Sequence, residues 1–288
     1  MRSVTIAPEI LGNLVGIGVS EKRTSRRPCG IAAVTFYVER KLPKSRLTRR
    51  LMLPGAIAGM TCDVVACGKV RPAVAGSPSD PLDPLIPGAQ VQVTGSKAGT
   101  LGAFVRDAAG DICLISNCHV LSPDLASPSQ GVHQPAIGYG GSRQVATVKK
   151  VVPISASDSN LVDVGLAKLD SGVQYQSAIP GVGSINGTGL PSRSEPVAKY
   201  GQATLETFGQ FDSIDADIVV PFDFMTATFA NVYAFRPSSF ADEGDSGSIV
   251  VEKRTGTAVG LLFATSPLLK FAISIEAIDN ALSGLTWL

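Results

Sequence analysis

The residues that could do chemistry gather around Ser246, in the stretch Asp-Glu-Gly-Asp-Ser-Gly-Ser at 242–248. Glycines on both sides of Ser246 allow backbone conformations that other residues avoid and let another segment approach closely. The apolar run Ile249–Val251 follows at once, as where a tight turn enters a strand. Two interpretations fit: a polar hairpin turn, since Gly, Asp and Ser are common in turns, or a turn that exposes the Ser246 hydroxyl as a nucleophile.

A nucleophilic serine needs a base that takes its proton, and histidine is the usual base near neutral pH. The chain has only two histidines. His119 follows the apolar segment 112–115 where a polar turn begins, whereas His133 lies in a loop without a supporting pattern. His119 is the candidate base, although a histidine at a strand end is more often structural or on the surface.

The base in turn needs an acceptor that holds its ring in the right tautomer. Asp163 stands in the otherwise apolar run 161–169. A carboxylate in such a setting is costly unless it finds donors, so the run implies a partner for Asp163. The alternative for Asp163 is a strand-end aspartate bound to local amides, and the alternative acid is Asp158, in a polar loop.

Around these residues the chain has three short segments in a fixed order. They are Asn-Cys-His-Val at 117–120, Asp-Val-Gly-Leu-Ala at 163–167 and Gly-Asp-Ser-Gly-Ser at 244–248. Together they resemble the three motifs of trypsin-like (chymotrypsin-fold) serine peptidases. Further likenesses lie at 102–105, before the histidine, at 197–202, a strand and turn of bacterial members, and at 260–263, a strand lining the substrate cleft. The resemblance covers roughly residues 89–284.

The resemblance implies a mainly β fold of two antiparallel six-stranded barrels with a C-terminal helix, and a catalytic crevice between the barrels. It implies that Ser246 attacks, His119 shuttles the proton and Asp163 orients the ring. The backbone N–H groups of Gly244 and Ser246 would form an oxyanion hole. The substrate-binding residues would be Phe240, Phe263, Ala264 and Thr265. Neither a metal nor a cofactor is needed.

The sequence also departs from the secreted digestive members of that family. It lacks their paired cysteines and any Ile-Val-Gly-Gly start that cleavage could free to ion-pair with Asp245, and Arg71 is followed by Pro72. Activation is therefore expected to differ, and the partner of Asp245 is an open question. Phe240 stands where an aspartate of the family selects basic side chains, which argues against Lys/Arg specificity and favours a small or apolar one.

The chain has 44% hydrophobic residues, 30 Gly and 19 Pro, which is typical of a globular protein rich in turns. Outside the motifs we therefore expect short strands. From residue 89 onward only the C-terminus indicates a helix: Ser274 could cap it, Gly284 would end it, and one of its faces carries Ile275, Ile278, Ala281 and Leu282. The predicted domains are a small α+β module at 1–71, a Pro-rich linker or strap at 72–88, and the peptidase domain at 89–288. In the first module we expect strands near 15–19, 31–38 and 62–66 and a short helix after Pro43.

Composition excludes several function classes. A net charge of +1 gives no indication of nucleic-acid binding. No apolar run approaches the length that spans a bilayer, and no secretory signal is recognisable. Five scattered cysteines do not make a disulfide framework or a zinc site, which suits a reducing compartment. The cytoplasm is the expected location.

Three functions remain open at this stage. The first is a bacterial or phage-like serine endopeptidase acting on protein or peptide substrates, in which residues 1–71 regulate, deliver substrate or bind a partner. The second is an inactive homologue that binds a partner. The third is hydrolysis of a small ester or amide by the same residues.

Overall fold

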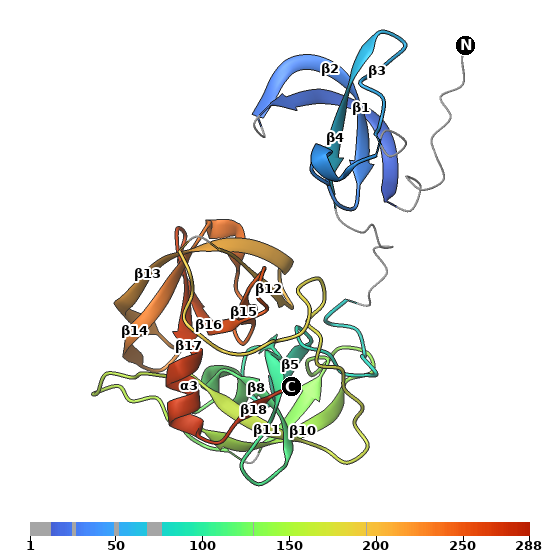
Figure 1. Ribbon diagram of the computed structural model, residues 1–288. Coiled ribbons are helices and arrows are strands. Elements are labelled where there is room, and N and C mark those ends of the chain that lie inside the picture. Colours follow the sequence, from blue (N-terminus) through green and yellow to red (C-terminus); the bar gives the residue numbers. More distant parts are fainter. Residues whose placement is uncertain (1–12, 25–26, 49–51, 68–76, 129, 194) are drawn as a thin grey trace. The chain divides into compact units, whose positions relative to one another are not determined.

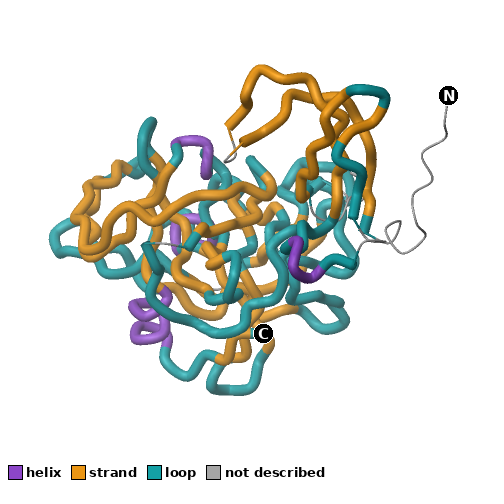
Figure 2. The backbone as a smooth tube through the Cα atoms, turned by 45° about the horizontal axis from the view of Figure 1, so that its top comes forward, coloured by secondary structure: helices purple, strands orange, loops and turns teal. Residues whose placement is uncertain are grey.

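The computed structural model describes residues 13–24, 27–48, 52–67, 77–128, 130–193 and 195–288. They belong to two compact units, Met1–Ala75 and Gly76–Leu288 (Figure 1). Strands dominate both units, and helices are few and short (Figure 2). No helix of the described residues has the length and apolar character needed to cross a bilayer.

The first unit is one four-stranded sheet in the order β1-β2-β4-β3. Its strands are β1 (Leu14–Thr24), β2 (Arg27–Val38), β3 (Ala56–Ile57) and β4 (Met60–Ala66). The three strands predicted here are confirmed. The helix expected after Pro43 is a single 3-10 turn, η1 (Lys44–Arg46), because three residues are too few to repay the cost of nucleating an α-helix. The described part of this unit is thus a β module and not the predicted α+β one.

The first half of the second unit is a curved eight-stranded sheet in the order β18-β7-β8-β11-β10-β9-β5-β6. Its strands are β5 (Gln90–Val93), β6 (Gly99–Thr100), β7 (Ala103–Arg106), β8 (Ile112–Ser116), β9 (Gly131–Gln134), β10 (Arg143–Val151), β11 (Gly165–Leu169) and β18 (Thr286–Trp287). Within the described residues its two edges do not pair with each other, so the closed six-stranded barrel expected here is an open sheet by hydrogen bonding.

The second half is a closed six-stranded barrel in the order β12-β13-β14-β17-β16-β15. Its strands are β12 (Pro196–Gly201), β13 (Leu205–Pro221), β14 (Thr226–Arg236), β15 (Ile249–Glu252), β16 (Ala258–Thr265) and β17 (Lys270–Ser274). A short 3-10 turn, η3 (Ser238–Phe240), follows β14. The mainly β class is confirmed, and one of the two predicted six-stranded barrels is closed.

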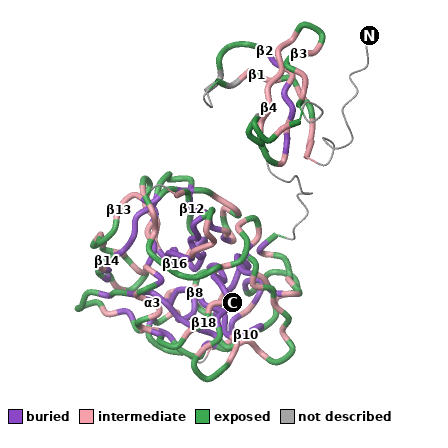
Figure 3. The backbone as a smooth tube through the Cα atoms, viewed as in Figure 1, coloured by how far each residue is buried: buried purple, intermediate pink, exposed green. Residues whose placement is uncertain are grey.

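Burial follows the apolar runs. β8 and β16 are buried along nearly their whole length, as Figure 3 shows. In contrast β10 contains both exposed and buried residues, since part of this strand meets solvent. Buried strands therefore lie next to both polar turns: β8 ends just before His119, and β15 begins at Ile249, just after the turn of Ser246.

Contacts from the ribbon of β13 and β14 join the two halves of the second unit. Asn160, in the loop before Asp163, donates its backbone N–H to Thr228 O at 2.9 Å and accepts from Ala230 N at 2.9 Å. The Asn160 side-chain amide also donates to Thr228 O at 3.0 Å. The loop that carries Asp163 is thereby fixed to the barrel that carries Ser246.

The proline-rich segment divides at the unit boundary. Residues 68–76 lie outside the described residues, whereas 77–88 pack onto the second unit as a strap. Leu85 is fully buried there and donates its N–H to Gln174 O at 2.8 Å, and Gly88 N donates to Leu101 O at 2.7 Å. The second unit thus begins before the predicted residue 89.

The predicted C-terminal helix is confirmed as α3 (Ile275–Leu282). Ser274 Oγ accepts a hydrogen bond from Ala277 N at 3.1 Å, and Ile275, Ile278 and Leu282 are buried on one face. Beyond the helix, Gly284 has φ of +76°, which other residues rarely adopt.

Ser274→Ala should remove this cap and lower the free energy of unfolding by about 1 kcal/mol. Urea denaturation followed by circular dichroism measures the loss. Ser239→Ala, at an exposed position of η3, serves as the control and should shift the midpoint far less. Equal shifts for the two variants would contradict the capping role.

Candidate functional site

His119 and Asp163 form the centre of the site. His119 lies on the one-turn helix α2 (Cys118–Leu121), directly after β8. Its Nδ1 lies 2.5 Å from Asp163 Oδ2, and its backbone N–H donates to Asp163 Oδ1 at 3.2 Å. Asp163 is fully buried, so this pairing supplies the partner that its apolar setting requires. With Nδ1 occupied, Nε2 makes no hydrogen bond to any described residue and is free to act as a base.

Asn117 holds this pair from behind. Its side-chain amide donates to the backbone carbonyl of Asp163 at 2.8 Å, which fixes the start of β11 against the end of β8. Asn117 is fully buried. The ring of His119 therefore sits on a framework of two paired strands and not on a mobile loop.

Ser246 lies in the turn that enters β15. Its Oγ is half-buried and donates to Phe263 O at 3.3 Å, and no hydrogen bond joins it to His119 in this structure. The glycines beside it are required by the backbone: φ is +96° at Gly244 and +99° at Gly247. A Cβ at Gly247 would also overlap Thr100 O and Ser116 Oγ. The turn is therefore the strained, hydroxyl-presenting kind.

Thr100 anchors this turn to the first half of the unit. Its N–H donates to Ser246 O at 2.8 Å and its hydroxyl donates to Gly244 O at 2.8 Å. The adjacent Gly99 has no room for a Cβ, which would meet both Val120, the neighbour of His119, and Ser246 O. The backbone of Ser246 thus lies close to the helix turn that carries His119.

Two backbone donors of the turn have no acceptor within the part of the chain that the structure describes. The N–H groups of Gly244 and Ser246 make no hydrogen bond to any described residue. Backbone donors next to buried structure are normally paired. Two free N–H groups flanking a serine hydroxyl are suited to stabilising a negatively charged oxygen.

Asp245, whose partner the sequence left open, forms a buried ion pair with Lys199 of β12. The Lys199 Nζ to Asp245 Oδ2 distance is 2.9 Å, and both side chains are fully buried. Asp245 also accepts hydrogen bonds from the Thr204 hydroxyl at 2.6 Å and from the N–H groups of Ala203, Thr204 and Asp242 at 3.0, 3.1 and 3.0 Å. Lys199 donates further to Thr204 Oγ1 and to Leu205 O.

Burial lowers the pKa of the Lys199 amine from its ordinary value of 10.5, and the attraction of Asp245 opposes that shift only in part. The charged pair therefore depends on its full set of hydrogen bonds. A Cβ at Gly201 would overlap the Asp245 carboxylate. The turn of Ser246 is thus held by a residue from within the chain.

The residues predicted to bind substrate occupy two settings. Phe240 is fully buried and its ring packs on Phe235, with centroids 5.7 Å apart, inside the barrel. Phe263, Ala264 and Thr265 lie on β16, where Phe263 meets the Ser246 hydroxyl. An aromatic residue that the sequence analysis missed, Phe222, lies beside His119 with ring centroids 6.0 Å apart.

The alternative candidates lie elsewhere. Asp158 is exposed and accepts from the hydroxyls of Ser155 and Ser157, which lower the pKa of its carboxyl. His133 lies on β9 away from any carboxylate partner, and its Nδ1 has no hydrogen bond. Burial raises the pKa of the Cys118 thiol, so the residue next to His119 is not a competing nucleophile.

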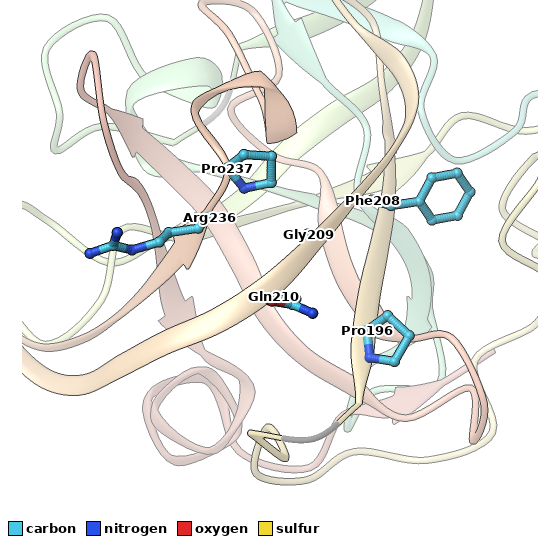
Figure 4. A pocket seen from close by; sticks show the side chains of 6 residues that line it. All are labelled: Pro196, Phe208, Gly209, Gln210, Arg236 and Pro237. Atoms are coloured by element: carbon cyan, nitrogen blue, oxygen red, sulfur yellow. The ribbon is translucent and has the colours of Figure 1, made fainter. Parts of the chain in front are cut away.

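Two of the cavities among the described residues lie away from the site, since neither is lined by His119 or Ser246. One of about 320 Å³ lies against the barrel at Pro196, Phe208, Gly209, Gln210, Arg236 and Pro237 (Figure 4). The other, of about 870 Å³, lies between α3, β14 and the loop before Asp163. The described residues contain no cluster of His, Cys, Asp and Glu that could hold a metal ion.

No family model and no curated protein matches this sequence. The structure is similar to several solved proteases. One is Nocardiopsis protease, at 16% identity and a TM-score of 0.53, over 70% of this chain and 97% of that one. A second is a glutamic acid specific serine protease, at 14% identity and a TM-score of 0.54, over 71% of this chain and 100% of that one. A third is Cellulomonas bogoriensis chymotrypsin, at 17% identity and a TM-score of 0.51, over 72% of this chain and 99% of that one. This chain has the fold of these chymotrypsin-like proteases.

Like Phe222, Lys199 is a residue of the site to which sequence reasoning gave no role. Its sequence signal was the same as that of Asp163: a charged residue within an apolar run, here residues 197–200. Which carboxylate it would meet could not be read from the strand alone.

Lys199→Met should leave Asp245 buried without its cation and lower the free energy of unfolding by about 3–5 kcal/mol. Urea denaturation of the full chain measures this. Lys253→Met, which breaks the partly exposed pair with Glu206, should cost at most about 1 kcal/mol. The double variant Lys199→Met with Asp245→Asn should recover part of the loss. A Lys199 variant as stable as the Lys253 control would refute the role of the pair.

Proposed function

We propose that this chain is a serine endopeptidase that cleaves peptide bonds through Ser246, His119 and Asp163. The observation that carries the proposal is the pairing of the partly exposed His119, whose Nε2 is free, with the buried Asp163, beside a glycine-flanked serine in a chymotrypsin-like fold. The similar structures named above are proteases.

In the proposed reaction the Ser246 hydroxyl leaves Phe263 O and donates to Nε2 of His119, which takes its proton as Oγ attacks the carbonyl carbon. The negative charge that develops on the carbonyl oxygen is stabilised by the N–H groups of Gly244 and Ser246, each typically contributing about 3 kcal/mol. Asp163 keeps the proton on Nδ1 and stabilises the imidazolium.

His119 then gives the proton to the leaving amine, and the peptide bond breaks to leave an acyl group on Ser246. Water attacks this ester with His119 again as the base, and the second product leaves with the regenerated hydroxyl. The Lys199–Asp245 pair supports these steps indirectly, because it fixes the residue between the two N–H donors.

We further propose that the N-terminal unit regulates the enzyme, delivers substrate or binds a protein partner. The motivation is its separate compact sheet, joined to the protease unit through a proline-rich segment. The proposed location is the cytoplasm, on the sequence grounds given above.

A fluorophosphonate probe should label the full chain, and the modified peptide found by mass spectrometry should contain Ser246. Ser246→Ala should abolish labelling, because it removes the attacking oxygen, and Asp163→Asn should slow it by about 10⁴-fold through the wrong tautomer of His119. The control Ser239→Ala should label like the parent.

Persistent labelling of the Ser246 variant would contradict the assignment. Absence of labelling in the parent, together with binding of an uncleaved peptide, would instead identify an inactive homologue. Faster turnover of small esters with no protein cleavage would identify an esterase.

Deletion of residues 1–71 should change either the rate of peptide cleavage or the recovery of a bound partner. Cleavage kinetics and affinity purification of the two forms measure these. If both quantities are unchanged, regulation, substrate delivery and partner binding by this unit are all rejected.

A further inference from the structure

Lys270, at the start of β17, is a buried charged side chain without a counter-charge. It is 5% exposed, and the one hydrogen bond of its side chain to a described residue is from Nζ to Ser266 O at 3.0 Å. No described carboxylate lies within ion-pairing distance of it. A lysine ammonium has three donors, and buried lysines are almost always paired. The contrast with Lys199, which has the carboxylate of Asp245, is direct.

Lys270 lies close to the nucleophile. Lys270 is paired with Thr265 across the hairpin of β16 and β17. Thr265 lies two residues after Phe263 on β16, and the carbonyl of Phe263 accepts a hydrogen bond from the Ser246 hydroxyl. With about 3.3 Å per residue along a strand and about 4.8 Å between strands, the Cα atoms of Lys270 and Phe263 are about 8 Å apart. The side chain of a substrate residue whose carbonyl lies at Ser246 and the side chain of Lys270 could together span that distance.

The side chain of Lys270 projects to the inner face of the barrel. Residues directly opposite in antiparallel strands share a face, and Lys270 is opposite Phe235 on β14. Phe235 packs on Phe240, which stands six positions before Ser246. Lys270 therefore lies on the same face of the barrel as Phe235 and Phe240, and the segment after Phe240 leads into the Ser246 turn.

The neighbouring edge of β16 is open to an extended peptide. β15 pairs with β16 only as far as Leu261, and 263–265 have β17 on one side and no described strand on the other. A substrate that adds as a strand along this edge, with its carbonyl at Ser246, would present the side chain of the attacked residue to the β16–β17 hairpin.

We propose that Lys270 binds the carboxylate of an aspartate or glutamate whose peptide carbonyl Ser246 attacks, so that the enzyme cleaves after acidic residues. This specificity rests on the proposed peptidase function. It agrees with the expectation that basic residues are excluded and replaces the small or apolar preference inferred from Phe240.

Two carboxylates close to the turn oppose this specificity. Asp242 and Glu243 precede Gly244, and both are exposed to solvent. Exposed charges are screened by water and salt, whereas the buried ammonium acts through a medium of lower dielectric constant. The buried charge therefore outweighs the two at the rim.

The test uses peptidyl diphenyl phosphonates that differ only in the residue bearing the phosphorus: the analogues of Glu, Gln and Leu. Each reacts with the serine directly, so no natural substrate is needed. In the full chain the Glu probe should modify Ser246 at least about 100-fold faster than the isosteric Gln probe, because a site built for a charged group rejects the analogue that lacks it.

Lys270→Met should remove this ratio, and Lys270→Arg should retain most of it. Lys253→Met, which removes a surface lysine of the same barrel, should leave it unchanged. The fluorophosphonate, which has no side chain for the site to select, should label all four proteins and report an intact Ser246 turn.

Equal rates for the Glu and Gln probes, or a Glu preference that survives Lys270→Met, would overturn the proposal while the peptidase function stands. The second result would mean that Lys270 only closes the hairpin through Ser266. If the fluorophosphonate fails to label the parent chain, the peptidase function itself fails, and the specificity falls with it.

Discussion

The ion pair between Lys199 and Asp245 is the interaction on which the candidate site depends. It connects β12, a strand of the barrel, to the residue that immediately precedes Ser246. Two charges in the interior are stable only with nearly complete hydrogen bonding, and Asp245 has five donors around its two oxygens. Because the cation comes from the folded barrel itself, no newly freed terminus is needed to fix the turn.

The second constraint is the attachment of the two halves of the second unit to each other. Thr100 holds the Ser246 turn from the first half, and the ribbon of β13 and β14 holds the loop before Asp163 from the second. Each half therefore positions a residue that belongs to the other. The three candidate residues can therefore come from strand ends far apart in sequence and still be brought together by a densely packed scaffold.

The two buried lysines of the barrel show how the same residue type takes different parts. Lys199 has its carboxylate within the chain and serves the geometry of the turn. Among the described residues the Lys270 ammonium bonds only to the backbone carbonyl of Ser266, and in our proposal its charge is the one that a substrate carboxylate meets. Buried charge without a partner costs free energy, so a ligand carboxylate would satisfy a need that the fold leaves open.

The sequence by itself determined the mainly β fold, the capped C-terminal helix and the identities of His119, Asp163 and Ser246 as candidates. These rest on local signals: apolar runs, turn residues, and polar residues at strand ends. The tertiary structure alone decided the partner of Asp245, the burial of Phe240 in the barrel and the lack of closure of the eight-stranded sheet. It also decided that no described carboxylate pairs with Lys270. Each of these depends on which distant strands pair and in which register, and the apolar strands here carry too little residue-by-residue information to specify that pairing.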